Sequence, residues 1–296
     1  MTSTASLSRA RRFEINGWAF VAPALLLICA FLAYPILQSL WMSLHAGQGA
    51  LIKFVGFGNV QRLVEDPIFH LALYNTLVFM VVQVPIMIAL ALVLACCLNM
   101  PRLRYRGLLR TAIFLPCVTS LVAYSVLFKS MFAYDGIINA SLLWLGLTAS
   151  PIPWLTDPFW AKVALVVSVT WRWTGYNMIF YLAALQNIDK SLYEAAQIDG
   201  IPPYRQFLSI TLPLLKPVIL FTTVTSTIGS LQLFDEPMNI TNGLQSDVTL
   251  TLSLYIYKIS FRYVPNFGYA ATISYVIVVL VGILAALQFL MARERD

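Results

Sequence analysis

The sequence predicts an all-helical integral membrane protein with six transmembrane helices, and two observations carry that prediction. Of the 296 residues, 59% are hydrophobic and only 11% are charged, whereas a soluble domain carries about 25% charged residues. No charged residue occurs between Glu14 and Lys53 or between Asp66 and Arg102, and each gap exceeds the roughly 20 apolar residues that cross a bilayer as a helix. Helices are expected because a backbone in lipid must satisfy its own hydrogen bonds.

We place the six spans by their apolar runs, at Trp18–Trp41, Leu71–Leu98, Leu109–Phe128, Ala161–Leu185, Pro217–Phe234 and Gly268–Met291. This leaves residues 1–17 and 292–296 as tails around one transmembrane domain, residues 18–291. The first apolar run is longer than a signal-peptide core and lacks a small-residue cleavage site, so we expect a retained helix. The four cysteines lack metal-ligand spacing, and we therefore predict no metal site.

Basic residues concentrate in the loops on one side of these spans. Twelve Lys and Arg lie in the two tails and in the connections after the second and fourth spans, and at most six lie in or beside the opposite loops. Loops rich in Lys and Arg stay in the cytoplasm, so we expect both termini to be cytoplasmic. This distribution accounts for the net charge of +6 without a nucleic-acid partner.

The connection between the fourth and fifth spans, residues 189–217, carries the local signals of two short helices with a sharp bend. Ser191 and Glu194 have the spacing of a capping box at a helix start. Gly200 can take the left-handed conformation that ends a helix, and the Pro-Pro pair after Ile201 can open the next one. These signals predict a compact protrusion suited to docking against another protein, although an ordinary re-entry loop would carry the same ones.

The same segment resembles the EAA loop of permeases in binding-protein-dependent ABC importers. That family's pattern is Glu-Ala-Ala, three residues, Gly, nine residues, Ile, one residue and Leu-Pro, and this sequence matches it at Glu194, Ala195, Ala196, Gly200, Ile210, Leu212 and Pro213. Residues 181–186, Phe234-Asp235, Tyr255, Tyr257 and residues 268–271 are similar to the carbohydrate branch, which includes the maltose-type permeases. Where that branch often has Thr-Gly-Gly-Pro, this chain has Thr241-Asn242-Gly243-Leu244.

The resemblance implies a type I ABC importer permease fold whose EAA loop forms coupling helices against a separate ATPase subunit. It also implies a second homologous permease, two ATPases that bind ATP and Mg, and an extracellular solute-binding protein, at a prokaryotic plasma (inner) membrane. The chain would then be a transport subunit without a cofactor of its own, and not an enzyme. In agreement, the sequence has no G-x-x-x-x-G-K-[ST] phosphate loop.

Seven polar and aromatic side chains are candidates for the path of a sugar: Trp171, Arg172, Trp173, Tyr176, Asn177, Gln232 and Asp235. Sugar sites combine aromatic rings with groups that bond hydroxyls, although aromatic residues near a membrane surface serve packing more often. A charge at the depth of Arg172 should face a cavity, meet a counter-charge or donate a hydrogen bond between helices. Ser226, Thr227, Gly229 and Ser230 suit close helix packing, including packing with a partner permease.

The leading hypothesis is therefore a permease subunit that translocates a mono-, di- or oligosaccharide delivered by an extracellular binding protein. A polyol or glycerol-phosphate is the alternative cargo, although a phosphate site needs several basic groups and only Arg172 lies deep. A secondary transporter should show coupling carboxylates inside its spans. A membrane enzyme should show a clustered catalytic set, and neither pattern is visible in the sequence.

Overall fold

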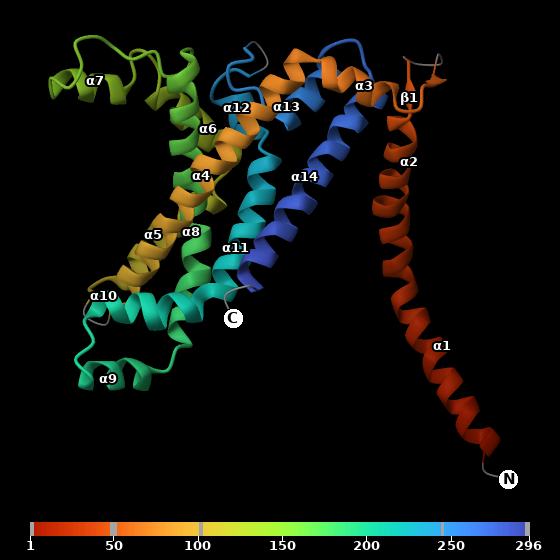
Figure 1. The fold of residues 1–296 in the computed structure, drawn as a ribbon, viewed down its shortest axis with the longest axis horizontal. Coiled ribbons are helices and arrows are strands. Elements are labelled where there is room, and N and C mark those ends of the chain that lie inside the picture. The colour runs from red at the N-terminus through yellow and green to blue at the C-terminus, as the bar shows by residue number, and fades with distance from the viewer. Residues whose placement is uncertain (1–2, 48–51, 101–102, 244–245, 294–296) are drawn as a thin grey trace. The chain divides into compact units, whose positions relative to one another are not determined.

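The computed structural model describes residues 3–47, 52–100, 103–243 and 246–293. The chain is mostly helical (Figure 1) and forms two compact units, residues 1–65 with 259–275 and residues 66–258 with 276–296. The prediction of an all-helical protein is confirmed, apart from one short hairpin. Arg102, Leu244 and residues 294–296 of the predicted C-terminal tail lie outside the described residues.

The first unit contains the N-terminal helices and the hairpin. α1 (Ser3–Ile28) continues through a π-helical segment, η1 (Cys29–Ala33), into α2 (Tyr34–Ser43), so α1 also runs through the predicted N-terminal tail. β1 (His45–Ala46) pairs antiparallel with β2 (Lys53–Phe54), and α3 (Gly58–Glu65) follows. Later in the chain, the π-helical segment η3 (Lys258–Arg262) leads towards α14 (Phe267–Arg293).

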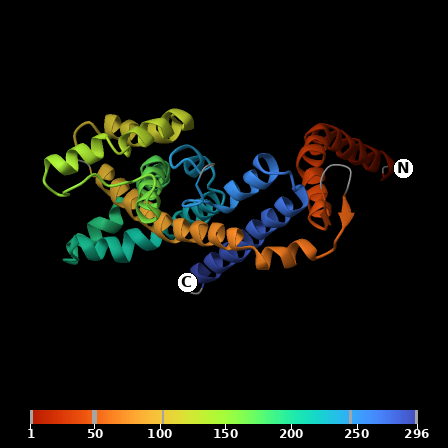
Figure 2. The ribbon, with the colours of Figure 1, turned by 90° about the horizontal axis from the view of Figure 1, so that it is seen from above.

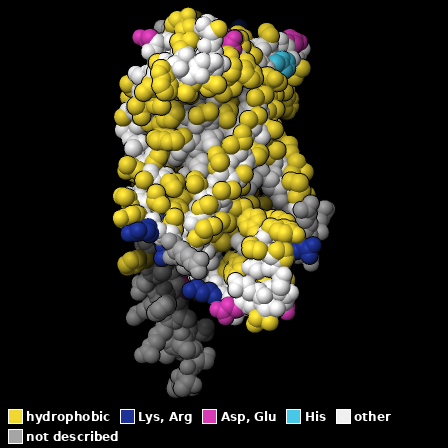
Figure 3. Space-filling view, turned by 90° about the vertical axis from the view of Figure 1, so that its left-hand side faces the viewer, with side chains coloured by type: hydrophobic (Ala, Val, Ile, Leu, Met, Phe, Trp, Pro, Cys, Tyr) yellow, Lys and Arg dark blue, Asp and Glu magenta, His cyan; other side chains and the backbone are white. Residues whose placement is uncertain are grey.

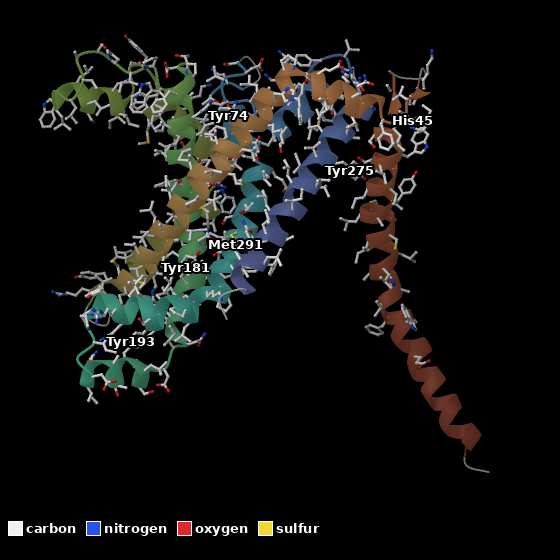
Figure 4. The ribbon with its side chains drawn as sticks, in the orientation of Figure 1. His45, Tyr74, Tyr181, Tyr193, Tyr275 and Met291 are labelled. Carbon is white, nitrogen blue, oxygen red and sulfur yellow. The ribbon has the colours of Figure 1, made fainter. Side chains whose placement is uncertain are left out.

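Side chain to backbone hydrogen bonds hold the first unit together. The Asn59 side chain donates to the carbonyls of Ser43 and His45, at 2.7 and 2.9 Å. The Tyr275 hydroxyl donates to the carbonyl of Ile36 at 2.7 Å, and both His45 and Tyr275 are labelled in Figure 4. Gly268 lies so close to the His45 carbonyl that a Cβ atom would clash with it. A glycine is therefore required at the start of α14.

The second unit is a helical bundle around α8 (Pro158–Gln186), which packs against α4 (Pro67–Asn99), α5 (Arg106–Val118) and α11 (Leu212–Leu231). In projection from above, α8 lies between the yellow-green α6 (Leu121–Met131) and α7 (Ile137–Trp144) and the teal α9 (Lys190–Ile198) and α10 (Pro203–Gln206) (Figure 2). The remaining elements are η2 (Phe207–Thr211), α12 (Asp235–Asn239) and α13 (Leu252–Tyr257).

Small residues let the helices of this bundle approach closely. Ala91 and Ala95 of α4 are fully buried in a cluster with Met178 and Tyr181 of α8. Gly175 of α8 lies against the backbone of Ile113 in α5, where a Cβ atom would clash. Without a hydrophobic force between helices in lipid, such close packing is the main source of association.

The predicted third span, Leu109–Phe128, is not one straight helix. It breaks between α5 and α6, which are bent by 98°. Pro116 lacks an N–H, which weakens the last turn of α5, and the Thr119 hydroxyl and backbone N–H both bond back to the Pro116 carbonyl, at 2.7 and 3.4 Å. A proline inside a span allows either a kink or a complete break of the helix, and the local sequence does not distinguish the two.

Proline also explains two of the π-helical segments. The N–H of Tyr34 donates to Cys29, five residues earlier, and the N–H of Leu212 donates to Phe207 in the same way. In both places the next residue is a proline, which has no N–H to donate to the carbonyl four residues before it. A widened π turn is a local adjustment to that missing hydrogen bond.

Four helical stretches of the described chain are long and apolar enough to cross a membrane: Gly17–Ser43, Pro67–Asn99, Pro203–Asn239 and Phe267–Met291. The α5–α6 pair adds a fifth if it crosses as one bent span. α8 has 29 residues, enough for about 43 Å of helix, but it carries Lys162 and Arg172 and is not among the four. On the face in Figure 3, hydrophobic side chains cover the middle, and most charged ones lie towards the two ends.

Candidate functional site

The segment 189–217, which we call the EAA loop, folds as two helices joined by a sharp turn. Asp189 caps α9 by accepting the backbone N–H of Ser191 at 2.9 Å. The predicted capping box of Ser191 and Glu194 was therefore wrong, because α9 begins at Lys190 and Ser191 already lies in its first turn. The backbone N–H of Ser191, followed by its side chain, lowers the pKa of the Asp189 carboxyl below its usual value.

Gly200 ends α9 in a Schellman arrangement. Its φ is +70°, its N–H donates to the Gln197 carbonyl at 3.1 Å, and the N–H of Ile201 donates to the Ala196 carbonyl at 2.9 Å. α10 then begins at Pro203, as predicted. The left-handed backbone requires a glycine or asparagine here, which gives a physical reason for the glycine of the motif.

The EAA loop brings its two motif halves together. The Tyr193 hydroxyl, labelled in Figure 4, bonds the Thr211 hydroxyl of η2 at 2.8 Å. Thr211 lies between Ile210 and Leu212, so this bond joins the Glu-Ala-Ala half to the Ile-x-Leu-Pro half. Ala196 and Thr211 are buried, Ile210 and Leu212 are half-buried, and the motif residues left exposed are Glu194, Ala195, Gly200 and Pro213.

A cavity of about 340 Å³ lies inside the second unit, between α4, α6, α8, α11 and α12. It is lined by aromatic, amide, hydroxyl and acidic groups, namely Gln83, Met87, Leu121, Val169, Trp173, Tyr176, Asn177, Thr225, Ser226, Gly229, Ser230, Gln232, Leu233, Phe234, Asp235 and Glu236. Its volume is at the lower end of the roughly 300–1,000 Å³ of small-molecule sites. Among these lining residues there is no Lys or Arg.

Five of the seven predicted path residues line this cavity: Trp173, Tyr176, Asn177, Gln232 and Asp235. Trp171 lies outside it and packs on the rings of Tyr124 and Phe128, at 6.0 and 5.2 Å between centroids. The helical period explains the difference, because residues 169, 173 and 176 share one face of α8 and residue 171 points elsewhere.

Arg172 is also outside the cavity. It is 5% exposed, and its Nη2 donates to the carbonyl of Thr119, at the break between α5 and α6, at 3.1 Å. Its guanidinium lies 4.8 Å from the centre of the Tyr124 ring. Arg172 is therefore a hydrogen-bond donor between helices. The break in the helix leaves the Thr119 carbonyl without a partner four residues on, and a buried carbonyl needs a donor.

Sequence reasoning missed several lining residues. The sequence pattern predicts helix packing for Ser226, Gly229 and Ser230, but the structure places them on the cavity wall. Thr227 does pack, because its hydroxyl accepts a 2.9 Å hydrogen bond from the Gln288 amide. Gln83 and Glu236, which are not among the sequence candidates, also line the cavity. A small polar residue in a membrane helix can either pack against another helix or line a cavity. The sequence does not tell which, because this depends on the neighbouring helices in space.

Comparison with known proteins shows the family to which this chain belongs. Residues 69–295 match the family described as "Binding-protein-dependent transport system inner membrane component". The chain is 62% identical, over the full length of both chains, to the lactose transport system permease protein LacF of Rhizobium radiobacter. It is 32% identical to the arabinooligosaccharides transport system permease protein AraP of Halalkalibacterium halodurans, over 93% of this chain and 87% of that one.

A solved bacterial alginate ABC transporter, in complex with an alginate pentasaccharide-bound periplasmic protein, has a chain with the same fold. The TM-score is 0.86 at 23% identity, over 97% of this chain and 96% of that one. Because the family and these relatives are transporter subunits, the secondary-transporter and membrane-enzyme hypotheses are rejected. This chain belongs to the family of inner membrane components of binding-protein-dependent transport systems.

Proposed function

We propose that this permease subunit translocates a neutral sugar through the cavity between α4, α8 and α11. The observation that carries the proposal is the cavity lining, in which Trp173 and Tyr176 can cover apolar sugar faces while Asn177, Gln232 and Asp235 bond hydroxyls. The relative at 62% identity is a lactose permease, so a lactose-type disaccharide is the preferred substrate.

The cavity also favours a neutral cargo over glycerol-phosphate. A phosphate site needs convergent basic groups, yet the lining includes Asp235 and Glu236 and no Lys or Arg. Arg172, the deep basic residue that could have served a phosphate, donates instead to the Thr119 backbone. An anionic solute would therefore meet carboxylates without a compensating charge.

The EAA loop is proposed to dock on a separate ATPase subunit. In α9 and at its end, the small residues Ala195 and Gly200 and the apolar side chain of Ile198 are exposed, together with the carboxylate of Glu194. In the complete importer, two ATPases that bind ATP and Mg would move this loop, a second permease would complete the pathway, and an extracellular binding protein would deliver the sugar. The chain would cross the membrane six times, with α8 as the fourth span and both termini in the cytoplasm.

Reconstitution tests the function directly. The chain is placed in liposomes with its partner permease, both ATPases and the binding protein, and uptake of labelled lactose is measured with and without ATP. We expect uptake that requires ATP and is not inhibited by excess glycerol-phosphate. Uptake that glycerol-phosphate abolishes, or the absence of ATP-driven sugar uptake, would overturn the proposal.

A matched pair of variants tests the site. Gln232→Ala removes an exposed amide that lines the cavity, whereas Gln61→Ala removes an exposed amide of α3 that does not. We expect the first to raise the KM of sugar uptake by about tenfold, which corresponds to one lost hydrogen bond of about 1.4 kcal/mol. The second should leave the KM unchanged. An equal change of KM in the two variants would show that Gln232 does not contact the sugar.

A further inference from the structure

Three charged side chains are buried within the described part of the chain: Arg172, Glu236 and Lys258 are 5%, 4% and 2% exposed. Lys258 has a partner, since its Nζ lies 2.7 Å from the carboxylate of Asp247. Arg172 of α8 and Glu236 of α12 form no direct ion pair with any residue that the structure describes. A buried charge is costly unless an opposite charge and hydrogen bonds compensate it.

Arg172 and Glu236 lie on two helices that pack against each other. α12, which carries Glu236, packs against α8, which carries Arg172, and also against α6. The guanidinium uses Nη2 for the Thr119 carbonyl, while its Nε and Nη1 are buried and have no hydrogen-bond partner among the described residues. The Arg172 side chain therefore has N–H groups on two nitrogens available to donate hydrogen bonds, on a helix that packs against the one that carries the buried Glu236.

The two residues differ in their relation to the cavity. Glu236 lines it, and Arg172 does not. A carboxylate accepts hydrogen bonds only. Glu236 can therefore accept them from the hydroxyl groups of a solute on one side, and on the other from a water molecule that the Arg172 N–H groups hold. The same arginine holds the break between α5 and α6 through Thr119.

We propose that Arg172, through a bridging water molecule, positions the buried Glu236 carboxylate to accept hydrogen bonds from the hydroxyl groups of the transported solute. Glu236 is then a solute-binding residue, and Arg172 is a positioning residue that acts through it. The inference rests on the proposed function, because it assigns these roles towards a hydroxylated solute in the same cavity.

A double-mutant cycle in the reconstituted importer tests the pair. Glu236→Gln, Arg172→Gln and the double variant are compared for the KM and the maximal rate of ATP-driven lactose uptake. We expect each single change to raise the KM by at least about tenfold, because a hydrogen bond to a charged group is lost. The double variant should be no worse than either single one, since neither charge is then left unpaired.

The Lys258 and Asp247 pair supplies the matched control. It is a charge pair in the same unit with one buried partner, and neither residue lines the cavity. Lys258→Gln with Asp247→Asn should lower the melting temperature of the complex and leave the KM for lactose unchanged. If Arg172 and Glu236 behave in the same way, their role is structural and the proposal is overturned.

Conservative variants cover the case in which the neutral ones fail to assemble. Arg172→Lys keeps the charge but lacks the several fixed N–H donors of the guanidinium, and Glu236→Asp keeps the charge on a shorter side chain. Each should assemble and raise the KM severalfold, and a KM like that of the unchanged protein would overturn the proposal. If the unchanged importer transports no sugar, the proposed function itself fails. If it transports sugar and only the KM shifts are absent, this inference alone fails.

Discussion

At the scale of residues, the position of a side chain around α8 separates the residues that line the cavity from those that pack. Trp171 and Trp173 have similar exposed fractions, 44% and 37%, yet only Trp173 lines the cavity. Trp171 packs instead on Tyr124 and Phe128. Composition made both tryptophans candidates, and the direction of each side chain around the helix decides between them.

This difference yields a matched test of the cavity. Trp173→Ala removes an aromatic wall, and we expect the KM of sugar uptake to rise by about tenfold, which corresponds to a stacking contribution of about 1.4 kcal/mol. Trp171→Ala should leave the KM unchanged while lowering the thermal stability of the complex, because it removes packing. A KM shift of the same size in both variants would contradict the assignment.

Asp189 predicts a pH dependence confined to the start of α9. Its lowered pKa means that the carboxylate stabilises the folded cap above the ordinary Asp value, near pH 4, and that this stabilisation is lost as pH falls through the lowered pKa. We expect the protection of the Ser191 amide in hydrogen exchange to be constant from about pH 5 to 8. Asp189→Ala should lower that protection over the whole range, and Asp189→Asn should retain most of it. Equal protection in all three proteins would show that Asp189 does not cap α9 in solution.

At the scale of elements, the EAA loop has an exposed surface around Gly200 and an internal hydrogen bond that joins α9 to η2. Gly200 supplies both the left-handed turn and a position without a side chain, and a Cβ atom there would meet nothing within 4 Å in this chain. If a side chain at position 200 lowers transport by more than backbone strain explains, the effect therefore comes from a clash with a partner protein. We call the hydrogen bond between the Tyr193 and Thr211 hydroxyls the brace.

Gly200→Asn tests the surface. Asparagine tolerates the left-handed turn, so α9 should end as before, while the added side chain obstructs docking on the ATPase. We expect normal insertion of the complex and a loss of ATP-driven uptake of about tenfold or more, equivalent to at least 1.4 kcal/mol of lost coupling. Gly146→Asn is the control, because Gly146 has a φ of +67° and open space around it but lies outside the EAA loop. Normal transport in Gly200→Asn would count against a docking role.

Tyr193→Phe tests the brace. The change removes one hydroxyl bond, worth about 1 kcal/mol, between α9 and η2. We expect faster amide exchange in α9 and fewer solute molecules transported per ATP hydrolysed, with an unchanged KM for the sugar. Tyr204→Phe is the control, since Tyr204 is exposed in the same loop. An unchanged transport ratio together with faster exchange would show that α9 transmits force without this bond.

At the scale of the whole molecule, orientation is the property that the distribution of basic residues predicts. Ser150 and Asp199 are exposed and belong to loops on predicted opposite sides of the membrane. In a background without the four native cysteines, Ser150→Cys should react with an impermeant maleimide added to intact cells. Asp199→Cys should react only after permeabilisation. The reverse pattern would place both termini outside.

The sequence alone determined the class of protein, the EAA motif and the candidate residues Trp173, Tyr176 and Asn177 of α8 that line the cavity. These depend on composition, on spacing within one segment and on residues of α8 that share a helix face, all of which are local properties. Only the tertiary structure decided that the third span breaks at Thr119, that Arg172 donates to that break, and that Ser230 and Glu236 face the cavity. Such features depend on which helices meet, because a polar side chain in a membrane helix can serve packing, a neighbouring backbone or a cavity, and its neighbours in space select among them.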